Sequence, residues 1–189
     1  MIYKLRANRD KYLNFFIDPY DIELVMGDYF LLGQPTWADF WKSVNATFYE
    51  DSDHGGALLM PDITVWGTSN CLALNQKAYE ALNVTLQPFG EFLQVTSEGI
   101  PYRVFHSTLQ TGLEFVDETK SKRTIDEVDY VEMQSLVFNE KLLEKKLVFQ
   151  TEFNNYRNMY CTEVFKSLVE SNGLKGLYFS TDLACVNEP

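Results

Sequence analysis

Two histidines limit the acid–base chemistry that this chain of 189 residues could perform. A serine or cysteine nucleophile would need a general base, and only His54 and His106 could supply an imidazole. The sequence contains neither a Gly-x-Ser-x-Gly nor a His-Glu-x-x-His motif. Its 27 acidic residues always allow some carboxylate pair in space, so such pairs carry little information. A small hydrolase that uses His54 or His106 with a carboxylate stays open as an alternative function.

Cys71 precedes a helix that we predict to begin near Asn75. A thiol near a helix N-terminus can have a lowered pKa. Nothing in the sequence places a histidine close to Cys71, so a small buried residue is the favoured interpretation. The three cysteines show no Cys-x-x-Cys spacing and are typical of free thiols in a reducing compartment.

The segment 50–56, Glu-Asp-Ser-Asp-His-Gly-Gly, combines three carboxylates with a histidine and raises the question of a metal site. Its spacing differs from the calcium-loop pattern, which alternates oxygen ligands and ends on a later glutamate. A solvated loop is the favoured interpretation. Glycine motifs that bind phosphate groups are absent from the sequence as well, so we predict neither a metal nor a cofactor.

The chain has 27 acidic and 16 basic residues, which gives a net charge of −11. Phosphate binding needs clustered lysine and arginine, so the composition disfavours nucleic acid as a partner. An acidic surface could steer a basic protein partner toward it, or it could merely keep an aromatic-rich chain in solution, and both interpretations stay open. The sequence shows no secretion signal and no run of about 20 apolar residues, so we expect a cytoplasmic protein without a membrane span.

Apolar periodicity predicts an α+β fold over residues 1–189, mainly antiparallel sheet with a few helices. An aromatic stripe predicts a helix over residues 37–48 with a buried face, although two tryptophans on one face could instead anchor a partner. The charged window 117–124 is expected to be an exposed loop, and 126–132 a surface strand with an acidic face. The other expected strands are 1–6, 12–17, 63–66, 91–95, 102–106 and 113–116, together with 136–138 and 147–149 as a pair.

The stretch 162–179 has the pattern of a helix, a tight turn and a strand. Thr162 suits the N-cap position, an apolar stripe follows at helical spacing, and Asn172-Gly173 can stop the helix. A similar unit lies 86 residues earlier, where Asn75 can cap a helix that is followed by another strand. We therefore expect a single domain, with two related helix–strand halves as the arrangement left open.

Three features occur together in residues 60–180: the Pro-Asp-Ile sequence at 61–63, a first helix ending at Leu82, and a C-terminal helix closed by Asn-Gly-Leu-x-Gly at 172–176 before an aromatic strand. In these features, residues 60–180 resemble a bacterial family of small acidic proteins that is classed among the immunity proteins of polymorphic toxin systems. Residues 1–60 match the family only loosely. These features mark where helices and strands begin and end, and they contain no catalytic group.

The resemblance implies a cytoplasmic immunity protein that is not an enzyme and that binds and neutralises a cognate toxin domain. A net charge of −11 would suit a toxin with a basic surface. A non-catalytic adaptor protein is a further alternative. We expect the partner contacts in the acidic loops, at Glu50, Asp51, Asp53, Asp117, Glu118, Asp126, Glu127, Asp129 and Glu132.

Overall fold

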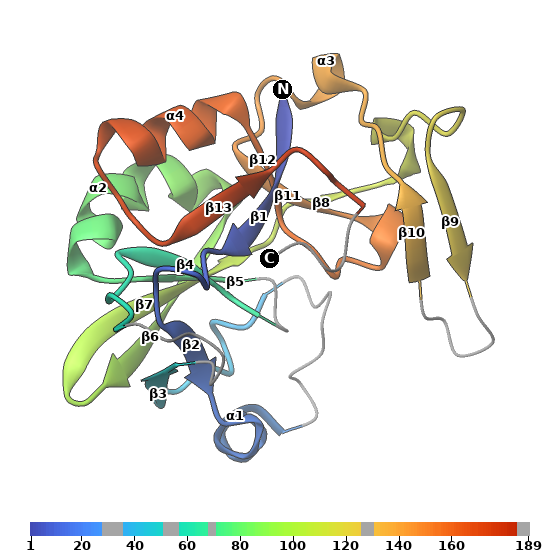
Figure 1. Cartoon of the computed structure of the whole chain (residues 1–189). Coiled ribbons are helices and arrows are strands. Elements are labelled where there is room, and N and C mark those ends of the chain that lie inside the picture. The colour runs from blue at the N-terminus through green and yellow to red at the C-terminus, as the bar shows by residue number, and fades with distance from the viewer. Residues whose placement is uncertain (28–35, 51–56, 68–70, 126–130, 185–189) are drawn as a thin grey trace.

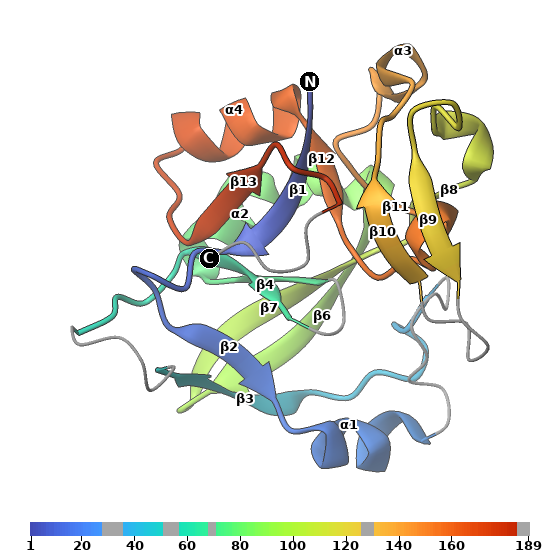
Figure 2. The ribbon, with the colours of Figure 1, turned by 45° about the vertical axis from the view of Figure 1, so that its right-hand side comes forward.

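The structure is a computed structural model that describes residues 1–27, 36–50, 57–67, 71–125 and 131–184. These residues form an α+β fold whose strands pair mostly antiparallel, as the sequence predicts (Figure 1). Two large sheets pack against a shared pair of helices. A smaller two-stranded sheet projects from one side of the molecule (Figures 1 and 2).

The first large sheet contains six strands and curls on itself. Leu13 N donates a hydrogen bond to Leu59 O (3.0 Å), and Leu59 N donates one to Lys11 O (2.9 Å). The segments that lead into the two edge strands of the sheet therefore meet. Ile22 and Met26 of α1 (Pro19–Met26) pack into the apolar core inside the curl. The strand order is β2 (Asn14–Ile17), β3 (Val44–Tyr49), β6 (Gly90–Ser97), β7 (Ile100–Ser107), β5 (Cys71–Leu74) and β4 (Ile63–Trp66).

The second large sheet joins segments from the two ends of the sequence. β1 (Ile2–Ala7) lies between β12 (Tyr160–Thr162) and β13 (Leu177–Ser180) and pairs antiparallel with both. Alternate side chains of β1 enter different cores, because successive residues of a strand point to opposite faces. Tyr3 and Leu5 join the core beneath the helices, whereas Ile2 joins the core on the other face. The sheet is completed by β11 (Val148–Thr151) and β8 (Gln110–Thr111).

Two helices, α2 (Gln76–Leu86) and α4 (Glu163–Ser171), lie side by side over the core that both sheets share (Figure 1). Each helix buries residues at helical spacing, such as Ala78 and Leu82 in α2. The Asn75 side chain accepts a hydrogen bond from Ala78 N (2.9 Å) and caps α2, which confirms the prediction. Gly173 follows α4 at φ +62°, the left-handed conformation expected of a residue that stops a helix. Thr162 does occupy the N-cap position of α4, although its side chain makes no capping bond.

The two helix–strand units are in register at a spacing of 87 residues rather than 86, since Asn75 and Thr162 are their N-caps. Their strands join different sheets, because β6 belongs to the six-stranded sheet and β13 to the five-stranded one. The similarity between the two units is therefore local. Each large sheet contains one of the two strands, and the two helices lie together over the shared core.

Residues 37–48 do not form the predicted helix. They begin with a tight turn, in which Phe40 N (3.0 Å) and Trp41 N (2.9 Å) both donate to Trp37 O, and continue into β3. The two tryptophans meet within this turn, where the Trp41 ring stacks on the Trp37 ring with 6.4 Å between their centroids. From Val44 onward, buried and exposed residues alternate, which is the periodicity of a strand. Trp37 is buried as predicted, but Phe40 is 42% exposed.

Two further predictions, between β7 and β12, are wrong. Residues 113–115 form a 3₁₀ turn, η3 (Leu113–Phe115), and not a strand. Residues 136–138 and 147–149 do not pair, because the charged segment between them contains α3 (Glu140–Leu143) and β11 pairs with β12 and β8 instead. Short apolar runs present similar surfaces, so their sequence alone does not determine which strands pair with each other.

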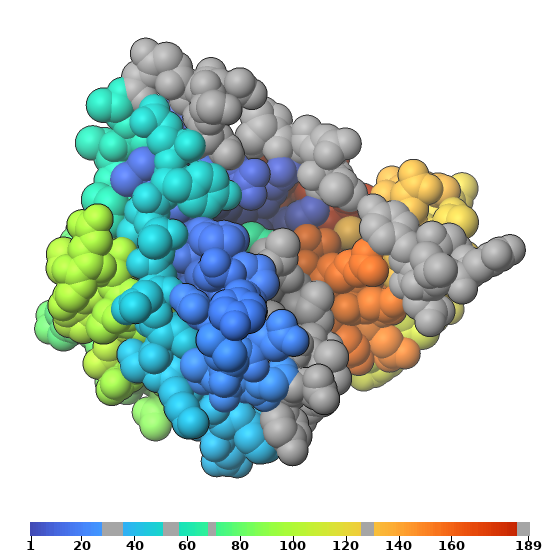
Figure 3. Space-filling model, turned by 90° about the horizontal axis from the view of Figure 1, so that it is seen from below, coloured from blue at the N-terminus to red at the C-terminus, as the bar shows by residue number. Residues whose placement is uncertain are grey.

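The small sheet consists of β9 (Lys122–Ile125) and β10 (Val131–Ser135), paired antiparallel. Residues 117–121 form a loop as predicted, but 122–124 belong to β9, and most of the predicted strand 126–132 lies outside the described residues. The small sheet rests on a third core, which includes Phe138, Phe149 and Tyr160. Seen from below, it lies to the right of α1, which is at the centre of the face (Figure 3).

Candidate partner-binding surface

We use the term acidic arm for residues 117–125 and 131–137. The name refers to the acidic sequence Asp-Glu-Val-Asp-Tyr at 126–130, which lies between β9 and β10, since the arm itself carries Asp117, Glu118 and Glu132 beside Lys120, Lys122 and Arg123. Hydrogen bonds hold the base of this arm together. Val137 N donates to Ser121 Oγ (2.9 Å), and Asp117 N donates to Val137 O (2.8 Å). Ser135 Oγ donates to Lys120 O (3.0 Å). The turn that leads into β9 is therefore tied to the segment that follows β10.

Arg123 fixes the acidic arm to the body of the molecule. Its guanidinium Nη1 donates to Phe153 O (2.6 Å) and to Glu152 O (3.2 Å), and the guanidinium lies 4.7 Å from the centroid of the Phe153 ring. Both acceptors belong to η4 (Glu152–Asn154), which follows β11 directly. A planar guanidinium with several donors can bind carbonyls and stack on a ring at once, which an ammonium group does less well. The contact sets the direction in which the arm projects.

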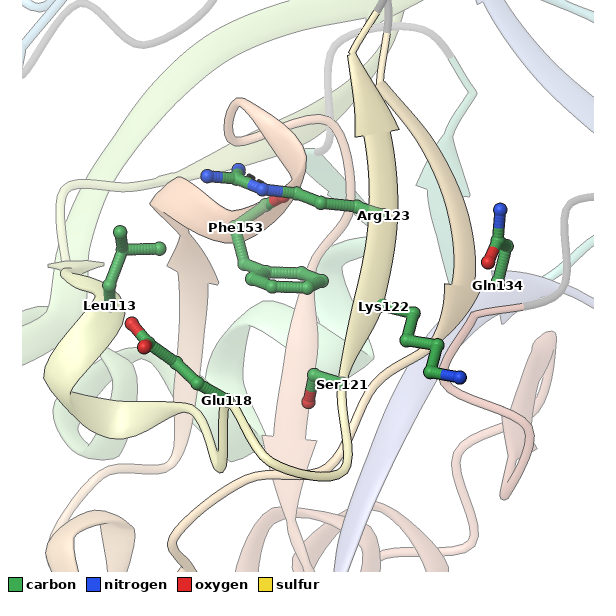
Figure 4. A pocket seen from close by; sticks show the side chains of 7 residues that line it. All are labelled: Leu113, Glu118, Ser121, Lys122, Arg123, Gln134 and Phe153. Atoms are coloured by element: carbon green, nitrogen blue, oxygen red, sulfur yellow. Dashed lines mark hydrogen bonds between the residues drawn. The ribbon is translucent and has the colours of Figure 1, made fainter.

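An open pocket of about 470 Å³ lies at the base of the acidic arm. The Phe153 ring lies between Arg123 and Glu118, and the Glu118 carboxylate points toward Leu113 (Figure 4). The pocket thus combines an aromatic surface with charges of both signs. Such a mixture suits a side chain of a protein partner, because aromatic and arginine residues are enriched where interfaces bind tightly.

The acidic arm brings together part of the predicted acidic surface. Glu118 lines the pocket at its base, and Glu132 is exposed on β10, opposite Thr124. Glu50 is also exposed but directly follows β3 of the six-stranded sheet. The remaining predicted contact residues lie outside the described residues: Asp51, Asp53, Asp126, Glu127 and Asp129.

Asp117 is engaged within its own turn. Its carboxylate forms an ion pair with Lys120 Nζ (2.8 Å) and accepts hydrogen bonds from Thr119 Oγ1 (2.6 Å) and Thr119 N (3.2 Å). The bond from Lys120, followed by those from Thr119, lowers the pKa of the Asp117 carboxyl below its ordinary value. This carboxylate therefore shapes the base of the arm, and a partner would have to compete with its present ligands.

His106 lies beside a carboxylate, as the hydrolase alternative requires, but in a closed setting. Its Nδ1 is 2.8 Å from Glu91 Oε1, directly across the β6–β7 hairpin. The Trp37 ring stacks on the imidazole with 3.7 Å between centroids. The His106 side chain is 2% exposed, so a substrate has no access to it in this conformation. His54, the other candidate base, lies outside the described residues.

Glu91 is a residue that sequence reasoning missed. Its carboxylate also accepts hydrogen bonds from Trp37 N and Ala38 N, and so binds the turn after Thr36 to the sheet. Burial alone would raise the pKa of Glu91, but the bonds from His106 and from the two backbone amides outweigh burial and lower it. The two-residue hairpin turn between β6 and β7 fixes the register that pairs Glu91 with His106, so counting outward from that turn could have found the pair.

The Pro-Asp-Ile sequence at 61–63 staples the two helix–strand units together. The Asp62 carboxylate accepts hydrogen bonds from Asn75 Nδ2, Lys77 Nζ and Lys175 N, each at 3.0 Å. At Gly176, where φ is +121°, a Cβ would lie 2.3 Å from a backbone oxygen of β4. The Pro-Asp-Ile sequence and the turn at 172–176 therefore touch one another and have a structural role.

Among the described residues, no three histidine, cysteine, aspartate or glutamate side chains are placed to hold a metal ion. Cys71 is buried, as predicted, and so is Cys161. Burial raises the pKa of the Cys161 thiol well above its ordinary value, which disfavours the reactive thiolate. No helix in the described parts of the chain is long and apolar enough to cross a membrane.

Sequence comparison finds no protein-family model and no curated protein that matches this chain.

Proposed function

We propose that this protein is an immunity protein, which binds a cognate bacterial toxin domain in the cytoplasm and neutralises it by direct contact. The observation that carries the proposal is the acidic arm, which projects from the body and is fixed at its base beside an open pocket. The resemblance of residues 60–180 to immunity proteins supports the same function.

The acidic sequence between β9 and β10 supports a basic partner. Glu132 is exposed on β10, and the sequence just before it contains further carboxylates. Acidic groups gathered in one place attract a basic protein surface over several ångströms and speed its association. Between Ile125 and Met133 the chain has no lysine or arginine, and its acidic residues there are Asp126, Glu127, Asp129 and Glu132.

The base of the acidic arm supports tight binding. The contacts of Arg123 with Phe153 O and with the Phe153 ring, together with the Ser121–Val137 hydrogen bonds, order the arm before any partner arrives. A surface that is already ordered loses less conformational entropy on association. A preorganised projection beside a pocket is a suitable element for covering a concave site on a toxin.

The two alternatives make different demands. A hydrolase that uses His106 would require Trp37 to leave the imidazole face, because the ring stacks there at 3.7 Å. A non-catalytic adaptor would use the same kind of surface as an immunity protein but would have no effect on a toxin. Neutralisation therefore separates the proposal from both.

The test is co-expression of the chain with the toxin domain encoded by the neighbouring gene. We expect rescue of growth by the unchanged chain, and weaker rescue by the double variant Glu118→Lys/Glu132→Lys. The matched control is Glu23→Lys/Glu170→Lys, which changes the net charge equally at exposed positions away from the arm.

Affinity for the purified toxin domain should fall about tenfold or more in the arm variant at low salt, since exposed charge pairs contribute up to about 1 kcal/mol each. Absence of rescue by the unchanged chain would contradict the proposed function. Equal affinity of the arm variant and the control would instead contradict the assignment of the contact to the arm.

A further inference from the structure

A second pocket lies on the other side of η3 from the arm. We call it the lysine pocket. It has a volume of about 560 Å³ and is open to the surface. Its walls come from η2 (Gln87–Phe89), at the end of α2, and from α3 with the residues that follow it. Leu113 of η3 lines the pocket of the arm and Phe115 of the same turn lines the lysine pocket, so the two pockets share η3 as a wall.

The charge of the lysine pocket is opposite to that of the chain as a whole. Lys141, Lys145 and Lys146 line it with a single acidic residue, Glu144, whereas the chain carries a net charge of −11. The Lys146 ammonium lies 5.4 Å from the centroid of the Phe115 ring. Lys141 and Lys145 are exposed, and within the described part of the chain neither has an ion-pair partner. These two charges are available to a ligand.

The surface between the lysines is apolar and firmly supported. Leu142 is 53% exposed on one wall, while Phe89 and Phe115 are partly buried. The neighbouring Leu143 is 0% exposed and anchors α3 in the third core. Asn139 N donates to Phe115 O (2.8 Å) and so ties the start of α3 to η3. The exposed leucine is therefore held in place beside the aromatic rings, where it remains out of the core.

We propose that the lysine pocket binds an acidic peptide segment of a protein partner, with a large apolar side chain against Leu142 and Phe115 and flanking carboxylates on Lys141 and Lys145. An apolar wall selects against a bare phosphate or sulfate, which has nothing to bury. The net charge of −11 selects against an extended polyanion such as a nucleic acid. A short acidic and apolar segment satisfies both features.

If the proposed toxin neutralisation holds, this partner is the toxin, and its surface carries a basic region facing the acidic arm next to an acidic segment facing the lysine pocket. Two neighbouring contacts of opposite sign fix the orientation of a partner, because any shifted arrangement brings like charges together.

The test measures peptide binding without the toxin, so its result is independent of the proposed function. The probe is a fluorescein-labelled hexapeptide, Glu-Glu-Leu-Phe-Glu-Glu, followed by fluorescence anisotropy with the full chain. Two control peptides carry the same label: one has glutamine in place of each glutamate, and the other has serine in place of leucine and phenylalanine. We expect only the first peptide to bind, and its binding to weaken with added salt.

The Lys141→Glu/Lys145→Glu variant should bind the acidic peptide about tenfold more weakly, since each reversed pair loses an attraction and gains a repulsion. Lys11→Glu/Lys42→Glu, at exposed lysines outside the pocket, serves as the control of equal charge and should bind more tightly than the pocket variant. Leu142→Ala should weaken binding severalfold without unfolding the chain, because that side chain is largely exposed. Equal binding of the three peptides, or equal loss in the pocket and control variants, would overturn the inference.

Discussion

Replacement of Asp62 by asparagine removes the negative charge that links the two helix–strand units while keeping the shape of the side chain. The Asp62 side chain is 17% exposed, and its carboxylate accepts hydrogen bonds from three groups on two helix–strand units. The amide of asparagine has only one acceptor oxygen, and its NH₂ group would face donors. At least one of Asn75 Nδ2, Lys77 Nζ and Lys175 N then loses its partner.

The size of the effect follows from the three donors. Lys77 is 55% exposed, so its ion pair with Asp62 contributes at most about 1 kcal/mol after solvent screening. The bonds from Asn75 Nδ2 and Lys175 N are partly screened as well, and each contributes about 1 kcal/mol. Asp62→Asn should therefore lower the free energy of unfolding by roughly 2 kcal/mol. For a chain of this length the corresponding fall in Tm is about 4–8 °C.

Thermal unfolding followed by circular dichroism measures this change, with urea unfolding as a second method. Asp10→Asn is the matched control, because that carboxylate is exposed. The control should unfold within about 1 °C of the unchanged chain, since most surface substitutions have little effect. A Tm for Asp62→Asn equal to that of the control at pH 7 would refute the claim that the Asp62 carboxylate stabilises the fold.

The pH dependence of the same difference is a further check. Burial would raise the pKa of Asp62, but the bonds from Asn75, Lys77 and Lys175 N outweigh burial and lower it. A lowered carboxyl pKa stabilises the folded state fully above the unfolded-state pKa of about 3.9, and the contribution is lost as the pH falls through the folded-state pKa. The difference between the unchanged chain and Asp62→Asn should be constant near neutral pH and shrink in acid. A difference that grows on acidification would contradict this sign.

Four other substitutions test other contacts. Gly176→Ala should lower the free energy of unfolding by about 2 kcal/mol or more and Gly173→Ala by about 1 kcal/mol, because only at Gly176 does the new Cβ meet backbone atoms; urea unfolding compares them, and equal losses would count against the close contact. Glu91→Gln should shift tryptophan emission to longer wavelength as Trp37 becomes exposed, and an unchanged spectrum would argue that Glu91 does not hold this turn on the sheet. Arg123→Lys should speed hydrogen exchange of amides in β9 and β10 but not in α2, and uniform exchange rates would show that the arm does not depend on Arg123.

The parts of the fold that could be predicted are those whose signals are local. Asn75 as a cap, the apolar stripe of α2 and Gly173 after α4 each act within a turn of their own helix, and the structure confirms all three. β4 also has its predicted bounds, because Pro61-Asp62 and Gly67 mark both of its ends in the sequence.

The errors arise where tertiary contacts outweigh local pattern. The spacing of Trp37 and Trp41 is helical, yet the hydrogen bond from Trp37 N to the distant Glu91 helps hold the segment as a turn. The candidate surface could be predicted only in part, because it also depends on tertiary contacts. The acidity of Glu118 and Glu132 is visible in the sequence, whereas the support of the arm by Arg123 joins segments 30 residues apart. No pattern in a single sequence encodes that pairing.

The position of β1 has a consequence for how the molecule is made. Its partners are among the last strands in the sequence, since Ile2 pairs with Thr162 and Ala7 with Leu177. A nascent chain on the ribosome therefore carries β1 without these neighbours until the segment from residue 160 onward has been made, and contacts of such long range form slowly. Tyr3 and Leu5 can enter the helical core only when β12 and β13 have emerged. The five-stranded sheet is therefore completed only after translation has passed residue 180.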